Sequence, residues 1–146
     1  MSNSSHGEVI LYVAGFLFSP DRQRVLLIRK NRPDSQAGQL NGVGGRIKDG
    51  EEPMHAMHRE FREEAGIIEL EWEPTAILFH SKYVVHFFEA FDHAIDIAYQ
   101  ASDEPIVIIN VEALSAHPIV SDLNFLIPIA LDQTGLFKPV LLANVE

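Results

Sequence analysis

Apolar and polar residues alternate in short blocks along this chain, and most of the apolar blocks have the length of a β-strand. Blocks rich in β-branched and aromatic residues, bounded by turn-forming residues, predict strands. These strands are expected at residues 9–18, 25–28, 72–80, 83–91, 106–111 and 137–142. A turn at Ser19, Pro20 and Asp21 joins the first two strands into a hairpin, and a turn at Ser81 and Lys82 joins the third to the fourth.

Two further segments, residues 53–65 and 120–131, predict helices. The first begins with Pro53, which is favoured at the first helical position, and is followed by Gly66, which is favoured just past a helix end. Residues 31–39 predict a polar loop, and the glycine-dense residues 41–45 predict a loop or a strand edge. Strands mixed with two helices indicate an α/β fold in which a mixed β-sheet lies between helical layers.

The length of 146 residues fits a single domain, residues 1–146, that can bury one core without cross-links. Residues 1–7 are polar, lack the regions of a signal peptide, and predict a short disordered lead-in. The chain has no cysteine, which excludes disulfides, thiolate catalysis and cysteine-ligated zinc. We expect a cytoplasmic protein that is a monomer or a homodimer.

The formal net charge of −10 argues against a nucleic-acid partner, because such a protein needs a basic face to neutralise phosphates. No apolar run approaches the ~20 residues that a membrane span requires, so no membrane partner is expected. A surplus of acids suits a protein that recruits divalent cations, although it is also an ordinary route to solubility. The position of the acids therefore decides between these interpretations.

Three carboxylates fall on one face of the predicted helix at residues 53–65. Glu60, Glu63 and Glu64 stand at i, i+3 and i+4, a spacing at which like charges cost about 0.2–0.5 kcal/mol per pair. Such a conflict is expected at a functional site, where something else compensates it. Clustered hard oxygen ligands suit Mg²⁺ or Mn²⁺. The alternative interpretation of this segment is a solvated, glutamate-rich helix that follows a glycine turn.

Residues around these glutamates fit the same chemistry. Arg59 lies one turn before Glu63 and can orient it through a charge-assisted hydrogen bond. Gly44 and Gly45 supply backbone without side chains, so that a carbonyl or an N–H group can approach a metal or a phosphate. Arg29 follows a predicted strand, where it could meet phosphates or belong to a solvated basic cluster.

The whole of segment 45–67 resembles the Nudix box, which it matches at every defined position. The box asks for Gly, five residues, Glu, seven residues, and then Arg-Glu-apolar-any-Glu-Glu-any-Gly-apolar. The chain supplies Gly45, Glu51, Arg59, Glu60, Phe61, Glu63, Glu64, Gly66 and Ile67. Seven fixed identities at residue frequencies of roughly 5–7% give odds on the order of one in a million for a chance match. The chain is therefore identified as a member of the Nudix hydrolase family.

This resemblance implies a Nudix α/β/α sandwich and a magnesium-dependent hydrolysis of a diphosphate linkage, with Mn²⁺ as a possible substitute. It implies that Glu60, Glu63 and Glu64 ligate the metal ions, and that the carbonyl of Gly44 completes the site, often together with Glu51. Glu63 or a nearby acid would activate water, and Arg59 would orient its neighbours. Metal ions in such a site bridge phosphate oxygens and lower the pKa of the attacking water.

Outside the box, residues 40–46 and 102–104 are similar to those of the MutT-like oxidised purine nucleoside triphosphatases. By this resemblance Asn41 and Asp122 would contact the base, and Glu104 would be a further acid that faces the metals. Each residue has a simpler interpretation: Asn41 as a turn former, Asp122 as a helix cap and Glu104 as a loop acid.

The chain also differs from those enzymes around the expected base site. It has Leu40 and Val120 where they have aromatic residues, and Leu123 where they have a second Asp. We therefore expect a purine to stack less well here.

The leading hypothesis is a pyrophosphohydrolase that converts a nucleoside triphosphate to a monophosphate and pyrophosphate, with modified purine nucleotides among the candidate substrates. The alternative keeps the reaction but acts on a nucleoside diphosphate derivative such as ADP-ribose. A third hypothesis is a non-catalytic Nudix module that senses nucleotides. Such modules usually lack box glutamates, whereas this chain keeps all of them.

Overall fold

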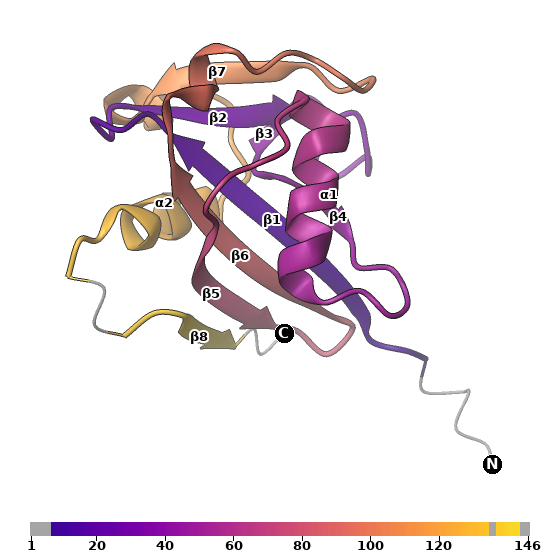
Figure 1. Ribbon diagram of the computed structural model, residues 1–146. Coiled ribbons are helices and arrows are strands. Elements are labelled where there is room, and N and C mark those ends of the chain that lie inside the picture. Colours follow the sequence, from indigo (N-terminus) through magenta and orange to yellow (C-terminus); the bar gives the residue numbers. More distant parts are fainter. Residues whose placement is uncertain (1–6, 135–136, 144–146) are drawn as a thin grey trace.

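A computed structural model describes residues 7–134 and 137–143, and its strands form an eight-stranded mixed β-sheet (Figure 1). The strands are β1 (Ile10–Phe18), β2 (Arg24–Arg29), β3 (Leu40–Asn41), β4 (Val43–Arg46), β5 (Glu73–Phe79), β6 (Tyr83–Phe91), β7 (Ile106–Asn110) and β8 (Val140–Ala143). The main path of the sheet runs β3-β2-β1-β6-β5-β8, while β4 pairs with β1 and β7 pairs with β2.

Strand β1 is the centre of this sheet. One of its edges pairs in parallel with β6 along its whole length, from Ile10 opposite Tyr83 to Phe18 opposite Phe91. Its other edge is shared, because residues 12–15 pair with β4 and residues 17–18 pair with β2, both antiparallel. The sheet therefore divides beside β1, and the β3–β4 segment bridges the division.

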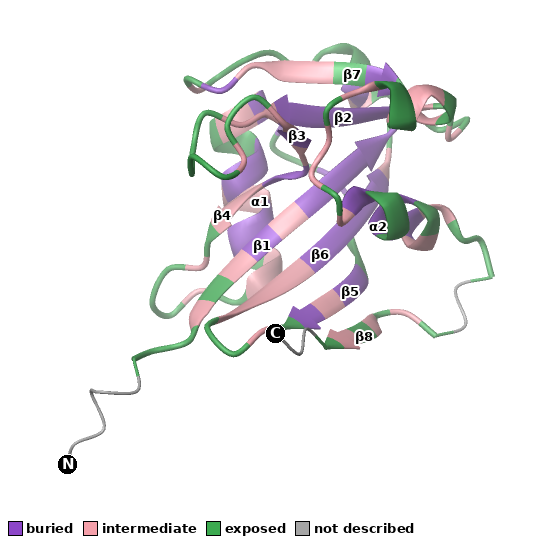
Figure 2. Ribbon diagram, turned by 180° about the vertical axis from the view of Figure 1, so that it is seen from behind, coloured by how far each residue is buried: buried purple, intermediate pink, exposed green. Residues whose placement is uncertain are grey.

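The two α-helices lie on opposite faces of the sheet, as the two views show (Figures 1 and 2). Helix α1 (Pro53–Ala65) packs Met57 and Phe61 into a core cluster with Val13 and Trp72. Helix α2 (Leu123–Leu131) packs its buried face into a second cluster, which includes Phe16 and Phe87. This arrangement confirms the expected α/β/α sandwich.

Local signals define α1, whose bounds agree with the sequence prediction. Pro53 occupies the first turn, and Gly66 ends the helix with a left-handed φ of 76°, donating its N–H to the carbonyl of Arg62. A residue with a side chain would be strained in that conformation. Figure 2 shows that α1 is partly buried along its length, and the carboxylate of Glu60 lies against Gly45 of β4.

Elsewhere the structure corrects several predicted bounds. Residues 41–45, predicted as a loop or a strand edge, contribute to β3 and β4, with Gly42 between the two strands. Helix α2 begins at Leu123 rather than at residue 120, and β8 covers residues 140–143 rather than 137–142. Two 3₁₀ helices, η2 (His93–Asp96) and η3 (Val111–Ala116), were not predicted. Residues 1–6 of the expected lead-in lie outside the described residues.

A buried ion pair attaches the segment after α2 to the sheet. Lys138 donates to both carboxylate oxygens of Glu89 on β6, at 2.9 and 2.8 Å, and to the carbonyl of Ala130 at 3.0 Å. Thr75 on β5 donates to the same carboxylate at 2.7 Å. Burial raises the pKa of Glu89, and the hydrogen bonds from Lys138 and Thr75 oppose that rise. The pair therefore fixes where the chain enters β8.

Lys138→Met should destabilise the fold by about 3–5 kcal/mol near neutral pH, because it leaves the buried Glu89 carboxylate without its cation. The pKa of Glu89 would then rise further, so the carboxylate accepts a proton at milder acidity. Its penalty is present above that raised pKa and is relieved as the pH falls through it. Urea unfolding of wild type and variant at neutral and mildly acidic pH should give the larger difference at neutral pH.

The double variant Glu89→Gln/Lys138→Met is the control, and it should recover part of the loss. An equal deficit of the single variant at both pH values would contradict this account.

Candidate active site

Arg59 lies at the centre of the acidic face of α1. Its guanidinium donates to both oxygens of Glu51, at 2.6 and 2.9 Å, to Glu60 at 2.8 Å and to Glu63 at 3.1 Å. It also donates to the backbone carbonyl of Arg46 at 3.0 Å. One cation thus compensates three carboxylates and ties α1 to the end of β4.

The charges in this cluster are coupled. Hydrogen bonds from Arg59 lower the pKa of Glu51 to about 2, and the Lys48 N–H adds to the effect. The same bond with Glu51 raises the pKa of Arg59, which therefore remains a cation. Burial raises the pKa of Glu60, while Arg59 opposes the rise. The face consequently combines one fully ionised carboxylate with one that burial makes harder to ionise.

The two glycines of β4 leave space for different neighbours. A Cβ on Gly45 would lie 2.5 Å from Oε2 of Glu60, so this position leaves the space that the carboxylate occupies. A Cβ on Gly44 would lie 1.9 Å from the carbonyl oxygen of Val13 on β1. Gly45 therefore serves the site, whereas Gly44 serves the close pairing of β4 with β1.

A cleft of about 460 Å³ lies on the other side of β4, on the face of the sheet that α2 covers. Its walls come from β1, β4, β5, β6, the loop after β2 and the start of α2. Gly44 and Gly45 line the cleft, and Gly45 also abuts Glu60. The cleft therefore reaches the strand against which the acidic face packs.

Asn41 and Asp122, the two residues expected to contact a base, both line this cleft. Asn41 accepts a hydrogen bond from Gly42 N–H at 2.8 Å and donates to Oε1 of Gln36 at 3.2 Å. Asp122 precedes α2, but its side chain makes no capping hydrogen bond. The helix-cap interpretation of Asp122 thus has no support in the geometry, whereas Asn41 both forms a local turn contact and lines the cleft.

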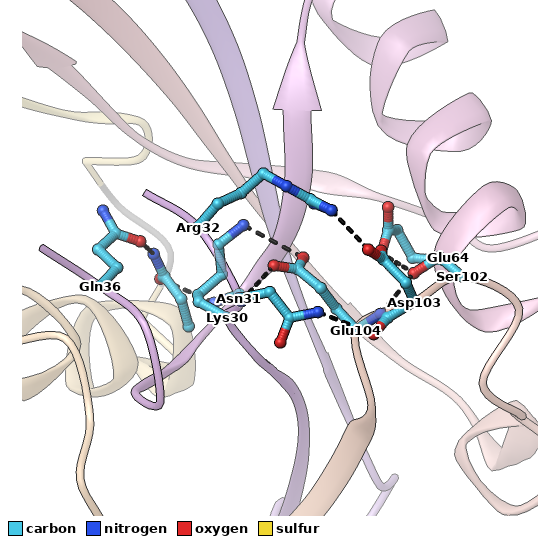
Figure 3. Close-up of polar contacts among 10 residues, drawn as sticks. Lys30, Asn31, Arg32, Gln36, Glu64, Ser102, Asp103 and Glu104 are labelled. Atoms are coloured by element: carbon cyan, nitrogen blue, oxygen red, sulfur yellow. Dashed lines mark hydrogen bonds and ion pairs between the residues drawn. The ribbon is translucent and has the colours of Figure 1, made fainter. Parts of the chain in front are cut away.

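Glu104 takes part in a network beside the cleft (Figure 3). It is buried, and its two carboxylate oxygens accept from Lys30 Nζ at 3.3 Å and from Asn31 N–H at 2.7 Å. Ser102 donates to Glu64 at 2.7 Å and accepts from the Glu104 N–H at 3.2 Å. Glu104 is thus joined to the acidic face through Ser102, and its own hydrogen-bond partners are Lys30 and Asn31.

Arg29 lies apart from the cleft-lining residues. Its guanidinium donates to the carbonyl of Gly38 at 3.1 Å, which holds the ends of the 30–39 loop together. Its neighbour Lys30 lines the cleft instead. Lys30 lies just past the end of β2, where the alternation of side chains along a strand no longer applies, so the sequence alone did not show which of the two basic residues faces the cleft.

Sequence reasoning missed the aromatic floor of the cleft, which is formed by Tyr12 on β1 and by Tyr83 and Phe87 on β6. Leu40, in contrast, is fully buried and does not line the cleft. The two tyrosines and Phe87 supply the aromatic rings that Leu40 and Val120 do not. The period-two spacing of residues 83, 85 and 87 was a visible signal that they share a face, but the parallel pairing of β6 with β1 was not.

Comparison with known proteins identifies the family. The model of the NUDIX domain family matches residues 10–123 of this chain. The chain belongs to the NUDIX domain family. It is a Nudix hydrolase, and its reaction class is the hydrolysis of nucleotide derivatives. Among curated proteins, no sequence relative matches the chain.

Solved structures confirm the Nudix fold. A MutT structure from work on Aliivibrio salmonicida and Vibrio cholerae is 22% identical with a TM-score of 0.71, over 83% of this chain and 95% of that chain. The NUDIX domain of Shewanella oneidensis NrtR, in complex with ADP ribose, is 18% identical with a TM-score of 0.71, over 89% and 91%. A MutT protein from Bacillus halodurans is 16% identical with a TM-score of 0.65, over 82% and 80%.

Nudix enzymes generally use divalent metal ions, and the acidic face fits such an ion in its donor chemistry. Glu60, Glu63 and Glu64 offer the hard oxygen atoms that Mg²⁺ prefers, and Gly45 leaves room beside Glu60. Within residues 7–134 and 137–143, no three carboxylate, imidazole or thiol groups stand close enough to enclose an ion as they are placed. Arg59, bonded to Glu60 and Glu63, holds two of the three carboxylates there.

Gly45→Ala should lower hydrolysis about 100-fold or more while the Nudix fold is retained. The new Cβ meets the mobile end of Glu60, so the carboxylate moves and the backbone does not, and a displacement of about 1 Å at a reacting site costs on the order of 100-fold. Gly44→Ala is the matched comparison. Its Cβ meets backbone, so it should destabilise the fold by about 3 kcal/mol.

Thermal melts and initial rates of both variants test this distinction. Wild-type rates for Gly45→Ala would show that the space beside Glu60 is not needed for activity. A large fall in its melting temperature would show that Gly45 is needed for the stability of the fold.

Proposed function

We propose that this Nudix hydrolase cleaves nucleoside triphosphates to nucleoside monophosphates and pyrophosphate, with Mg²⁺ as its metal and Mn²⁺ as a substitute. One observation carries the proposal: Gly45 of β4 borders both the cleft that contains Asn41 and Asp122 and the carboxylate of Glu60. A nucleotide with its base in the cleft would therefore extend its phosphates toward the acidic face.

The cleft suits a nucleoside. Asn41 and Asp122 present an amide and a carboxylate that can pair with the edge of a base, while Phe87 and the tyrosine rings provide an apolar floor. Lys30 is a cation in the same cleft, paired with the buried Glu104, and it can meet a phosphate. These groups support recognition of a base and a phosphate chain in one molecule.

The acidic face supplies the chemistry. When bound, Mg²⁺ would neutralise phosphate charge and lower the pKa of the attacking water. Glu60, Glu63 and Glu64 would hold it, completed by the carbonyl of Gly44. Glu63 is the most exposed carboxylate bonded to Arg59, with 44% of its side chain accessible, so it is our candidate for accepting the proton of the water. Arg59 orients Glu60 and Glu63 throughout.

The first test is of the metal and the glutamates. Hydrolysis should require Mg²⁺ or Mn²⁺ and stop with EDTA, and Glu63→Gln and Glu64→Gln should reduce it to the chelated level. Each substitution keeps side-chain volume and relieves like-charge repulsion, so stability in metal-free buffer should hold or rise slightly. Pyrophosphate release and thermal melts are the measurements. Full turnover in EDTA would contradict the metal requirement. Glutamine variants that melt at a lower temperature yet remain active would show that these glutamates are structural.

The second test is of the base site. Asn41→Ala and Asp122→Ala should change discrimination among bases more than the rate of the chemical step, because a buried polar partner left unsatisfied costs about 1–3 kcal/mol. That cost corresponds to roughly a 5- to 150-fold change in relative kcat/KM for the preferred base. Gln133→Ala, an exposed residue after α2, is the control.

The profile is measured over purine and pyrimidine triphosphates and ADP-ribose. Unchanged substrate ratios in both variants would place base recognition elsewhere. A preference of the wild type for ADP-ribose would replace the triphosphate proposal with the diphosphate-derivative alternative, and no turnover of any nucleotide would favour a non-catalytic sensing module.

A further inference from the structure

The segment 99–104, which we name the strap, links the end of α1 to the loop after β2. At the α1 end, Tyr99 N–H donates to the carbonyl of Ala65 at 3.1 Å, and Ala101 N–H donates to the carbonyl of Glu64 at 3.0 Å. The last carbonyls of a helix have no partner within the helix, so these bonds complete α1. The ring of Tyr99 also lies against Gly66, where a Cβ would meet it at 2.2 Å.

Ser102 is the point at which the strap acts on a side chain of the acidic face. Its hydroxyl donates to Oε1 of Glu64 at 2.7 Å, a short bond to a carboxylate. The hydroxyl oxygen of Ser102 in turn accepts the N–H of Glu104 at 3.2 Å, which fixes the rotation of the hydroxyl. Figure 3 shows Ser102 between Glu64 and the residues that follow it in the strap.

At its other end the strap holds the cleft wall. Glu104 accepts from Lys30 and from the Asn31 N–H, and Asn31 donates its side-chain amide to the carbonyl of Asp103 at 2.9 Å. Arg32 pairs with the Asp103 carboxylate on the surface. A continuous path of hydrogen bonds therefore runs from Glu64 through Ser102 and Glu104 to Lys30.

From this path we infer that Ser102 is a positioning residue, which sets the orientation of Glu64 for metal binding and at the same time holds the Glu104 end of the strap against Lys30 and Asn31. The inference rests on the proposed function, since it takes Glu64 to be a metal-binding carboxylate. When a metal-binding carboxylate loses a hydrogen-bond partner of this kind, the affinity of the site for the metal typically falls about 10- to 100-fold.

The experiment measures Mn²⁺ binding to the full chain by electron paramagnetic resonance, and amide hydrogen exchange at Asn31. Asn31 is exposed, and its N–H is donated to Glu104, so its exchange reports on that end of the strap. Ser102→Ala should weaken Mn²⁺ binding about 10- to 100-fold and speed exchange at Asn31. Ser102→Thr keeps the hydroxyl and should restore both. Ser81→Ala, at an exposed serine in the β5–β6 turn, should change neither.

Thermal melts accompany each variant. If Ser102→Ala folds poorly, Ser102→Cys, which is nearly isosteric but a weaker donor, should lose Mn²⁺ affinity in the same direction while it remains folded. Wild-type Mn²⁺ affinity in a folded Ser102→Ala or Ser102→Cys variant overturns the inference, whatever the exchange result.

Neither readout depends on turnover, so the two proposals fail separately. A wild-type chain that binds Mn²⁺ but cleaves no nucleotide would overturn the proposed function and leave the Ser102 result standing. A wild-type chain that cleaves nucleotides, with Mn²⁺ affinity unaffected by loss of the Ser102 hydroxyl, would overturn only the role of Ser102. A wild-type chain that binds no Mn²⁺ would overturn both.

Discussion

The site depends on the hydrogen bonds of one guanidinium, that of Arg59. Three carboxylates within reach of one another repel, and a helix that carries two of them would pay for that repulsion in stability. The planar donor fork of arginine can satisfy several carboxylate oxygens at once, which the ammonium of lysine cannot match. Arg59 therefore allows Glu51, Glu60 and Glu63 to lie close together. Its hydrogen bond to the carbonyl of Arg46 holds this cluster against the end of β4.

The glycines of β4 are the steric complement of this electrostatic arrangement. Helix α1 can place a carboxylate against the sheet only where the sheet presents no side chain, and Gly45 is that position. The same strand forms a wall of the cleft, so the acidic face and the cleft are separated by little more than one strand of backbone. Arg59 compensates the carboxylates, and Gly45 leaves room for one of them. Together they bring the acidic face on one side of the sheet next to the cleft on the other side.

Helix α1 and its acidic face could be predicted because the residues that define them are close together in the sequence. Pro53 and Gly66 stand at the two ends of α1, and the box motif lies within a single stretch of chain. The bounds of α1 and its glutamate face followed from those residues. The strands β3 and β4 could not be predicted in the same way, because glycine disfavours strands and only the close approach of Val13 explains Gly44.

The cleft was harder to predict because its residues meet through pairing of distant strands. Alternation along β6 shows that Tyr83 and Phe87 share a face, but it does not show that β6 lies beside β1. Where β2 ends was also missing from the sequence, and it decides that Lys30 rather than Arg29 lines the cleft. Asn41 and Asp122 were found only through a family resemblance, and the network that joins Glu104 to Lys30 had no signal in the spacing of its members.

The parallel pairing of β1 with β6 also has a consequence for how the protein is made. The acidic face is assembled from residues close in sequence, within 45–64, whereas the floor of the cleft joins residue 12 to residues 83–87. Contacts between residues far apart in sequence close large loops and form late in folding. During synthesis the helix with its glutamates can therefore form well before the chain contains β6. A nascent chain would carry charges able to attract a cation while it had no place for a nucleotide.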